Sequence, residues 1–386
     1  MVRHSSRIEL SQSALKKNFN FLKKKIGKNV RLSSVVKANA YGHGIDPYVT
    51  MCEKCGINHF SVASSFEAEE VLRVAKPETD IAIMGILYDE DLEWAVEHEI
   101  EFYVFNYLRF PKVLEAAKKV GKPAKIHLEV ETGANRTGVT AGEFKKCITF
   151  MKRNRNHLTF KGLCSHFGGA ESQANKFKID RQFLRFKQFA ADCKKKKYQA
   201  EYLHISSSAG ALAYPESRFD MVRIGVSQYG FWPSPDIYYH HLNETGKRYE
   251  KGLQRIFTWK TDIMDTRDVP EGEFIGYGTA YQATRDMRIA VLPLGYSNGY
   301  PRGLSNRGHV LIHGKKAPIT GLINMNLFMV DITHIPEARL GDEVVLIGRQ
   351  KNNSINVASF TQSTMLLNQE MMSRLPAAIP RKPVKF

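Results

Sequence analysis

Residues 31–44 read RLSSVVKANAYGHG, a short β-branched and apolar run that ends on Lys37 and passes directly into small residues and glycines. Similar runs recur up to residue 226, and amphipathic stretches rich in Lys and Glu separate them, such as 65–74 and 141–153. We expect strands at 31–36, 59–63, 80–84, 101–105, 125–130, 160–165, 202–205 and 221–225. Strands that alternate with helices form parallel β/α units, and eight such units over about 200 residues close into a barrel.

The pattern changes after about residue 240. Residues 236–251 are polar and predict turns, and Pro and Gly turns such as Val269-Pro270-Glu271-Gly272 separate the runs that follow. Strand-like runs with few helices between them occupy 256–264, 288–292, 309–313, 327–332 and 343–347. The sequence therefore predicts an α/β protein with an N-terminal (β/α)8 barrel over residues 1–244 and a mainly β C-terminal domain over residues 245–386.

The composition excludes several classes of protein. With 386 residues, 43% hydrophobic and 25% charged, the chain is typical of a globular protein of two or three domains. The formal charge of +17 raises the question of nucleic acid. The excess is scattered, however, and its densest runs at 23–25 and 194–197 lie in polar, helix-like stretches typical of a solvated face. We therefore expect no nucleic-acid partner.

The sequence also bears on membranes, metals and compartment. It has no stretch of about 18 consecutive apolar residues, and its N-terminus lacks the apolar core of a signal peptide. The odd number of cysteines is typical of a reducing compartment, so we expect a cytoplasmic protein without a membrane partner. Cys52-Glu53-Lys54-Cys55 has the spacing of half a zinc site, but no second Cys pair or nearby His pair completes four ligands. We expect no metal.

Polar side chains follow the predicted barrel strands at their carboxyl ends, where barrel enzymes carry their active sites. Lys37 ends the first strand, and a lysine made neutral by burial can form a Schiff base, although a lone lysine there more often reaches solvent. The later strand ends read GANR at 133–136, SHFGG at 165–169, HISSSAG at 204–210 and VRIGV at 222–226. Cationic and hydroxyl groups gathered beside the last strands are typical of a site for a phosphorylated ligand.

The run VVKANAYGHG at 35–44 resembles the cofactor-lysine signature of the alanine racemases, and the likeness extends from Arg7-Ile8-Glu9-Leu10 to Ile379-Pro380-Arg381. Supporting matches fall in the family's order at 136, 165–167, 206–208, 221–225, 276–279, 294–299, 325 and 329–331. The resemblance implies a pyridoxal 5'-phosphate enzyme that interconverts L-alanine and D-alanine and supplies D-alanine for peptidoglycan. It also implies a homodimer in which each active site is completed by the β domain of the partner subunit.

The resemblance assigns the two catalytic residues. Lys37 resembles the Schiff-base lysine, which also carries a proton on one face of the cofactor, and Tyr277 from the other subunit resembles the proton carrier on the opposite face. Two groups on opposite sides of a planar carbanion suit racemisation, because the proton leaves one face and returns to the other. An ordinary tyrosine pKa near ~10 is unsuitable at neutral pH, and cations lower it. His166 and Arg223 are the expected cations.

The remaining site residues are also carried over by position. Arg223 matches the residue that faces the pyridine nitrogen, and His166 matches the ring-side residue that links Arg223 to Tyr277. Arg136, near the phenolic oxygen, and Met325, from the partner subunit, match substrate-binding positions. The positions around the cofactor phosphate are Tyr41, Ser208, Gly225, Val226 and Tyr296.

Four positions depart from the commoner family pattern. Glu129 stands where many members have a lysine that takes up carbon dioxide, and we expect its carboxylate, ionised more firmly beside Arg136, to supply the same negative charge. Ser207 replaces an Asn, and Asn326 replaces an Asp. Ala377 replaces a tyrosine that often narrows the entrance of the site, which leaves room for a larger side chain.

Two alternatives follow from these departures and from the rest of the family. A racemase of broader or different specificity, acting on serine or basic amino acids, is the nearest. A catalytically silent cofactor-binding protein would keep the barrel and its lysine but would lack the β domain, so Tyr277 and the full C-terminal region argue against it.

Overall fold

The computed structural model describes residues 4–250, 252–364 and 367–385, and it contains two compact units. The first, called here the barrel unit, comprises Ala14–Ala38 and Tyr48–Arg255. The second, called the β unit, comprises Met1–Ser13, Asn39–Pro47 and Ile256–Phe386. This division differs from the predicted one, because the N-terminal strand and the segment after Lys37 belong to the β unit.

The barrel unit holds eight parallel strands in the order β8-β7-β6-β5-β4-β3-β2-β9. Arg223 N on β9 donates to Ser206 O, directly after β8, at 3.0 Å and joins the two ends of the series into a nearly closed ring. The predicted barrel is confirmed. Its strands are β2 (Arg31–Val35), β3 (His59–Ser64), β4 (Asp80–Ile86), β5 (Glu101–Val104), β6 (Ala124–Glu129), β7 (Leu158–Cys164), β8 (Tyr202–His204) and β9 (Met221–Ile224).

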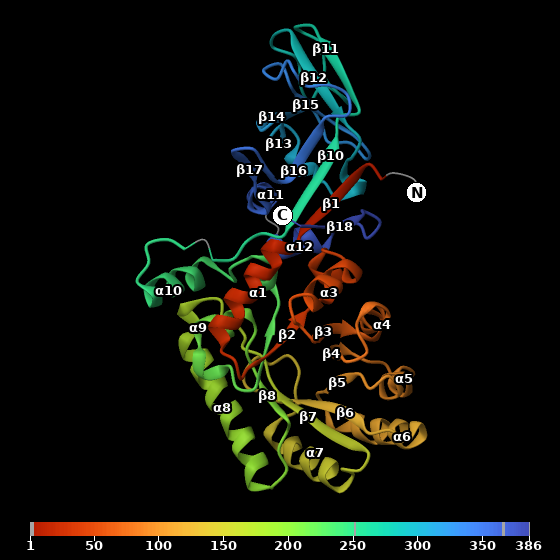
Figure 1. The fold of residues 1–386 in the computed structure, drawn as a ribbon, viewed down its shortest axis with the longest axis vertical. Coiled ribbons are helices and arrows are strands. Elements are labelled where there is room, and N and C mark those ends of the chain that lie inside the picture. Colours follow the sequence, from red (N-terminus) through yellow and green to blue (C-terminus); the bar gives the residue numbers. More distant parts are fainter. Residues whose placement is uncertain (1–3, 251, 365–366, 386) are drawn as a thin grey trace. The chain divides into compact units, whose positions relative to one another are not determined.

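Helices lie on the outside of this ring of strands (Figure 1). The predicted helices 65–74 and 141–153 are confirmed as α4 (Ser65–Val74) and α7 (Ala141–Arg153). A reciprocal capping box between Thr140 and Glu143 starts α7, which satisfies backbone donors that the first turn leaves free. The other helices are α1 (Gln12–Ile26), α3 (Ile45–Glu53), α5 (Leu92–Glu97), α6 (Phe110–Val120), α8 (Lys176–Lys195) and α9 (Ser208–Ala213).

The prediction of turns over 236–251 was wrong for its first part, because Pro235–Thr245 forms helix α10, whereas 246–250 contain no helix or strand. The Ser234 side chain accepts a hydrogen bond from Ile237 N, proline occupies the first turn, and Gly246 ends the helix with φ of 65°. These are ordinary start and stop signals, and buried Ile237, His241 and Leu242 supply the apolar face. The sequence therefore contains the signals for this helix, but they cover only a short segment. Lys251 lies outside the described residues.

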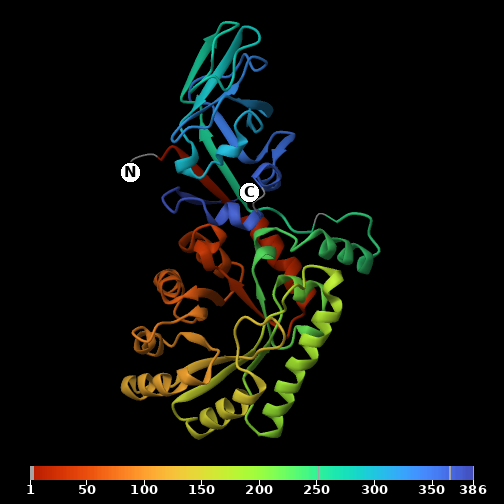
Figure 2. The same cartoon turned by 180° about the vertical axis from the view of Figure 1, so that it is seen from behind.

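The β unit is built on a ten-stranded sheet (Figures 1 and 2). The predicted strands are confirmed as β10 (Phe257–Asp262), β12 (Met287–Leu292), β13 (His309–Ile312), β15 (Phe328–Asp331) and β16 (Glu343–Gln350). The turn predicted at 269–272 follows β11. Further strands are β1 (Ser6–Ser11), β11 (Asp265–Val269), β14 (Lys315–Thr320), β17 (Asn353–Ile355) and β18 (Arg381–Val384), and the helices are α11 (Val357–Thr364) and α12 (Asn368–Ser373).

The pairing of β1 explains why the N-terminus belongs to the β unit. Ile8 of β1 pairs with Trp259 of antiparallel β10 and with Arg381 of parallel β18. Ile8 and Trp259 are fully buried, so the pairing places apolar side chains in the core of the sheet. Tyr300 packs beside Trp259 and stacks on Phe328 at 4.7 Å between ring centroids.

No helix within the described residues is long and apolar enough to span a membrane. Across the same residues, no group of three or more His, Cys, Asp or Glu side chains is placed to hold a metal ion. The five cysteines are free thiols.

Candidate active site

The strand that carries Lys37 is tied to the turn that follows β9. Gln228 Nε2 and Tyr229 Oη both donate to Val35 O, at 2.8 and 2.9 Å, and Ser34 Oγ donates to Gln228 Oε1 at 2.7 Å. Gln228 and Tyr229 lie in a 3-10 turn, Val226–Tyr229, directly after two of the predicted phosphate-binding positions. The strand that ends at Lys37 and the turn after β9 are therefore joined by buried hydrogen bonds.

After Lys37 the chain forms an unusual turn. The short helical segment α2 (Lys37–Tyr41) has positive φ at Ala38, Asn39, Ala40 and Tyr41, between 52° and 54°. A left-handed helical conformation costs about 1 to 2 kcal/mol for each L-residue, so contacts outside the segment must hold it. Glu67 provides one, because its carboxylate accepts hydrogen bonds from Ala38 N at 2.5 Å and from Ala63 N at 2.8 Å.

The carboxyl ends of the strands bring together a group of cations. Part of the Lys37 side chain is exposed, but burial, with a further contribution from the positive charge of Arg136, lowers the pKa of its ammonium, and Glu67 opposes this effect. Burial also lowers the pKa of His166 to about 3, and Arg223, Arg136 and Lys37 add to that shift. His166 is therefore neutral at working pH. The expectation that it acts as a cation toward Tyr277 was wrong, since its neighbours are already positive.

Arg223 is fixed by five acceptors. Its Nη1 donates to His204 Nδ1 and, at 3.2 Å, to His204 O. Its Nη2 donates to Ser165 O at 2.6 Å, to Ile205 O at 3.2 Å and to His166 Nδ1 at 3.5 Å. Arg223 is only 5% exposed, so this guanidinium is held rigidly at the barrel mouth. Its contact with His166 agrees with the pairing that the sequence predicted.

The turn after β9 has the form of an anion site. Ser208 begins α9, and its Oγ accepts hydrogen bonds from Gly225 N at 3.0 Å and Ser227 N at 3.5 Å. The Ser227 side chain is fully buried, and its Oγ has no hydrogen-bond partner in the described structure. A buried hydroxyl without a partner costs free energy, so a ligand that bonds it would stabilise this turn. Ser208 is thus hydrogen-bonded to the turn that contains Gly225 and Val226, and a phosphate at these residues stays a prediction.

Glu129 is buried at the end of β6, with 7% exposure. It receives a hydrogen bond from the Thr137 side chain, and the charges of Arg223 and Arg136 favour its ionised form. Burial is the larger influence, however, and raises its pKa above the ordinary value. The prediction that Arg136 makes Glu129 ionise more firmly was wrong, because desolvation outweighs the attraction of the arginines.

The β unit carries the remaining predicted residues. Tyr277 lies between two glycines of positive φ and is 71% exposed. Tyr296 and Met325 lie on adjoining loops, joined by Tyr296 N to Asn324 O at 3.0 Å and by Ser297 N to Met325 O at 3.1 Å. Asn326 Nδ2 donates to Ser297 Oγ at 2.9 Å and braces the same pair of loops.

Tyr41 belongs to the β unit through the segment 39–47. Arg381 holds this segment, since its Nε and Nη2 donate to Gly42 O at 3.2 and 3.1 Å. Burial raises the pKa of Tyr41 to about 12. Its phenol therefore stays protonated, and it can donate a hydrogen bond to an anion such as a phosphate.

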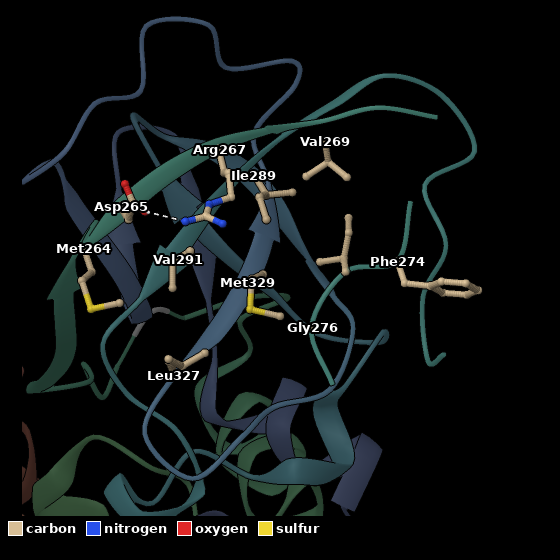
Figure 3. A pocket seen from close by; sticks show the side chains of 11 residues that line it. Met264, Asp265, Arg267, Val269, Phe274, Gly276, Ile289, Val291, Leu327 and Met329 are labelled. Carbon is tan, nitrogen blue, oxygen red and sulfur yellow. Dashed lines mark ion pairs between the residues drawn. The ribbon is translucent and has the colours of Figure 1, made fainter. Parts of the chain in front are cut away.

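A pocket of about 350 Å³ opens beside Gly276 in the β unit (Figure 3). Its walls come from β11, β12 and β15 and from the loops beside them, and Arg267 and Asp265 lie at its edge. Apolar side chains line most of it: Met264, Val269, Phe274, Ile289, Leu327 and Met329. Phe274, which lines the pocket, and Tyr277, three residues further along the chain, are both exposed.

Sequence reasoning missed the residues that hold these groups in place. Glu67, Gln228 and Tyr229 fix the turn around Lys37, and His204 accepts a hydrogen bond from Arg223. Gln228 and Tyr229 follow the predicted phosphate positions directly, so proximity in the sequence could have suggested them. Glu67 gives no such signal, because its helix position is typical of an ordinary N-terminal acidic residue.

Comparison with known proteins gives the same family along nearly the whole chain. Residues 10–233 match the family model "Alanine racemase, N-terminal domain", and residues 256–383 match "Alanine racemase, C-terminal domain". The alanine racemase of Halothermothrix orenii is 34% identical over 376 residues, which cover 97% of this chain and 95% of the relative.

Solved structures agree with the sequence comparison. The alanine racemase from Streptomyces coelicolor A3(2) superimposes with a TM-score of 0.87 at 28% identity and covers 98% of both chains. The fold is shared with an alanine racemase from Bartonella henselae, described with covalently bound pyridoxal phosphate, at a TM-score of 0.81, 23% identity and full coverage of both chains. The chain therefore belongs to the alanine racemase family of pyridoxal-phosphate-dependent enzymes, as the sequence predicted.

Proposed function

We propose that this protein interconverts L-alanine and D-alanine at the barrel mouth, with pyridoxal phosphate attached to Lys37. The observation that carries the proposal is the lowered pKa of Lys37 among Arg136, Arg223 and neutral His166. A lysine that loses its proton readily can attack a carbonyl and later carry a proton, whereas a fully charged ammonium can do neither. Arg136 and Arg223 also attract an anionic cofactor and an amino-acid carboxylate.

The residues present fit this cofactor. The unpartnered Ser227 hydroxyl lies in the turn beside Gly225 and Val226, where a phosphate can accept its hydrogen bond. We assign the phosphate to Ser208, Gly225, Val226, Tyr41 and Tyr296, following the family pattern. When bound, pyridoxal phosphate supplies the electron sink that stabilises negative charge at the substrate α-carbon.

The protein's own residues then orient the substrate and move the proton. Lys37 Nζ accepts or returns the α-proton on one face, and we assign the opposite face to the Tyr277 hydroxyl. Arg223 only donates hydrogen bonds, so it leaves a facing pyridine nitrogen unprotonated. His166 is neutral and hydrogen-bonded to Arg223, and we propose that it links that guanidinium to Tyr277 of the other subunit.

We propose further that the enzyme is a homodimer with shared active sites. Tyr277 and Met325 are 71% and 55% exposed in a single chain, although the family pattern gives both a role at the reacting substrate. The pocket beside Gly276 and the exposed Phe274 form a surface of the kind that a second copy of this chain would cover (Figure 3). In a bacterial cytoplasm the D-alanine product would serve peptidoglycan synthesis.

The substrate assignment is tested by racemisation of an amino-acid panel with the purified, cofactor-loaded protein. We expect alanine to give the highest kcat/KM and serine a lower one. Ala377 is small and exposed, which favours a broader range of amino-acid substrates as the second candidate. Its carbonyl accepts a hydrogen bond from Arg381 Nη1 at 2.8 Å. Faster racemisation of lysine or arginine than of alanine would replace the proposal by that candidate.

Glu129 provides a second test, on the proposal that its carboxylate replaces a carbamate. We expect bicarbonate to leave the activity unchanged, because a glutamate needs no carbon dioxide to be charged. Glu129→Gln keeps the shape but removes the charge beside Arg136 and Arg223, and we expect it to cost about 1 to 3 kcal/mol in kcat/KM. Glu129→Ala should cost at least as much.

The pH profile sharpens this test. Burial raises the pKa of Glu129, so its charge is lost as pH falls through that raised value, and activity that depends on the charge falls with it. Glu129→Gln has no such charge to lose, and its acidic limb should move to lower pH. Glu131→Gln, which changes a carboxylate two residues away, is the matched control. Wild-type kinetics in both Glu129 variants would leave Glu129 without a role in the reaction.

A further inference from the structure

A row of buried polar side chains crosses the inside of the barrel unit and ends at Arg223. Glu101, His127 and His204 are at most 1% exposed, and they lie on β5, β6 and β8. His127 Nε2 lies 2.7 Å from Glu101 Oε2, and His127 Nδ1 lies 2.8 Å from His204 Nε2. His204 Nδ1 is hydrogen-bonded to Arg223 Nη1. The row thus joins a buried carboxylate at the start of β5 to the guanidinium at the barrel mouth.

The two ends of the row fix every proton in it. Arg223 can only donate, so His204 Nδ1 must accept, and a neutral His204 then carries its hydrogen on Nε2. That hydrogen is donated to His127 Nδ1, and His127 in turn carries its hydrogen on Nε2 and donates it to Glu101. An ionised carboxylate only accepts, which agrees with this order. All three hydrogen bonds therefore run in one direction, from Arg223 to Glu101.

The charges around the row support this order. Burial acts to raise the pKa of Glu101, but hydrogen bonds from His127 and His59 outweigh it and hold the pKa well below the ordinary value. Lys161 Nζ lies 3.6 Å from the second carboxylate oxygen. Burial lowers the pKa of both His127 and His204, so the two imidazoles are neutral. The row has a negative end, a positive end and no charge between them.

The strand between the two histidines leaves room for their bond. Gly162 of β7 pairs with His127 of β6 and Tyr202 of β8. A Cβ atom at position 162 would stand 2.0 Å from His127 Nδ1 and 2.7 Å from His204 Nε2. Any side chain there would occupy the place of the hydrogen bond, so glycine is the residue that the row requires.

We propose that Glu101 and His127 are positioning residues for Arg223, which they hold by fixing the tautomer of His204. This inference rests on the proposed function, in which Arg223 faces the cofactor. In the other tautomer, His204 Nδ1 would carry a hydrogen that points at the Arg223 N–H, and the pair would be repelled. Arg223 requires this tautomer from one end of the row, and the negative charge of Glu101 favours the same tautomer from the other end, through His127.

The test compares Glu101→Gln with the control Glu201→Gln. Both remove a carboxylate beside Lys161, but Glu201 is half exposed and lies outside the row. We expect Glu101→Gln to lower kcat about tenfold with KM changed less than about threefold, as is common when a group behind an active-site residue is altered. Glu201→Gln should retain wild-type kinetics.

A second arm separates positioning from stability. On a His204→Gln background, Glu101→Gln should lower kcat no further, because His204, through which Glu101 acts on Arg223, is already replaced. A merely structural role predicts that the two losses add, and it also predicts that kcat follows thermal stability. Equal kinetics of Glu101→Gln and Glu201→Gln, or additive losses, would overturn the inference.

A third readout needs no activity. Nitrogen-15 NMR of the imidazoles in the cofactor-free protein should show His127 and His204 neutral with hydrogen on Nε2 in the wild type, and a changed His204 signal in Glu101→Gln. Hydrogen on His204 Nδ1 in the wild type would overturn the proposed order even if racemisation is confirmed. An inactive wild type with the expected tautomers would instead contradict the proposed function and leave the order of the row standing.

Discussion

Lys37→Ala is expected to abolish racemisation and to remove the visible absorbance of the lysine-bound cofactor. The reason is chemical, because the covalent link requires a primary amine at this position and the proposed proton carrier on this face is the same amine. Purified variant and wild type would be compared by spectrum, by racemisation rate and by reduction with borohydride. We expect the variant to hold no reducible, covalently attached cofactor.

Lys125→Ala is the matched control for this experiment. Lys125 pairs with Glu99 at 3.2 Å, at the opposite end of a barrel strand from the cationic group. Its loss should leave both the spectrum and the rate unchanged. Borohydride-trapped cofactor on another lysine of Lys37→Ala, with activity retained, would disprove the assignment of Lys37.

The fold could be predicted from the sequence where local pattern and global structure agree. Short apolar runs between amphipathic stretches are sufficient to place all eight barrel strands, since each strand of a parallel barrel is buried on both faces. The same pattern fails at two strands of the β unit. β11, at the edge of the sheet, has no buried side chain, and β14 contains Pro318, so neither resembles a buried strand.

The pairing of segments that lie far apart in the sequence was harder to predict from the sequence. Ile8 pairs with Trp259 and Arg381, and no periodicity in the N-terminal segment identifies partners so far along the chain. The predicted boundary at residue 244 consequently places β1 with the barrel, whereas its contacts are with the β unit.

The barrel part of the candidate site was predictable for a geometric reason. The carboxyl ends of parallel strands share one end of the barrel, so polar residues just after several strands must converge whatever the loops do. Lys37, His166 and Ser208 follow that rule, and Arg223 lies next to the last residue of β9. The electrostatics were less predictable, because the balance of burial and charge at His166 and Glu129 depends on distances that a sequence does not contain.

The buried row behind Arg223 could not be predicted from the sequence for the same reason. Glu101 begins β5, where a charged residue usually faces solvent, and His127 lies between two apolar residues of β6. Only the three-dimensional arrangement shows that they point inward and meet.

Mixing two inactive variants is expected to restore activity if the active site is shared between subunits. Lys37→Ala lacks the proton carrier on one face, and Tyr277→Phe lacks the hydroxyl assigned to the other. After random exchange at equal amounts, half of the dimers are mixed, and each mixed dimer has one site with both residues intact. About a quarter of wild-type activity should therefore return.

The controls decide how this result is interpreted. Each variant alone should be inactive, and subunit exchange must be verified with differently tagged chains, because slow exchange also gives no recovery. A mixture of Lys37→Ala with wild type gives the matched comparison, since half of all its sites should be active if the sites are independent. Verified exchange without recovery would place Lys37 and Tyr277 in the site of one subunit. In that case, contacts within its own chain would have to bury Tyr277, which is 71% exposed. A second copy of the chain would then no longer be the proposed partner of the surface beside Gly276.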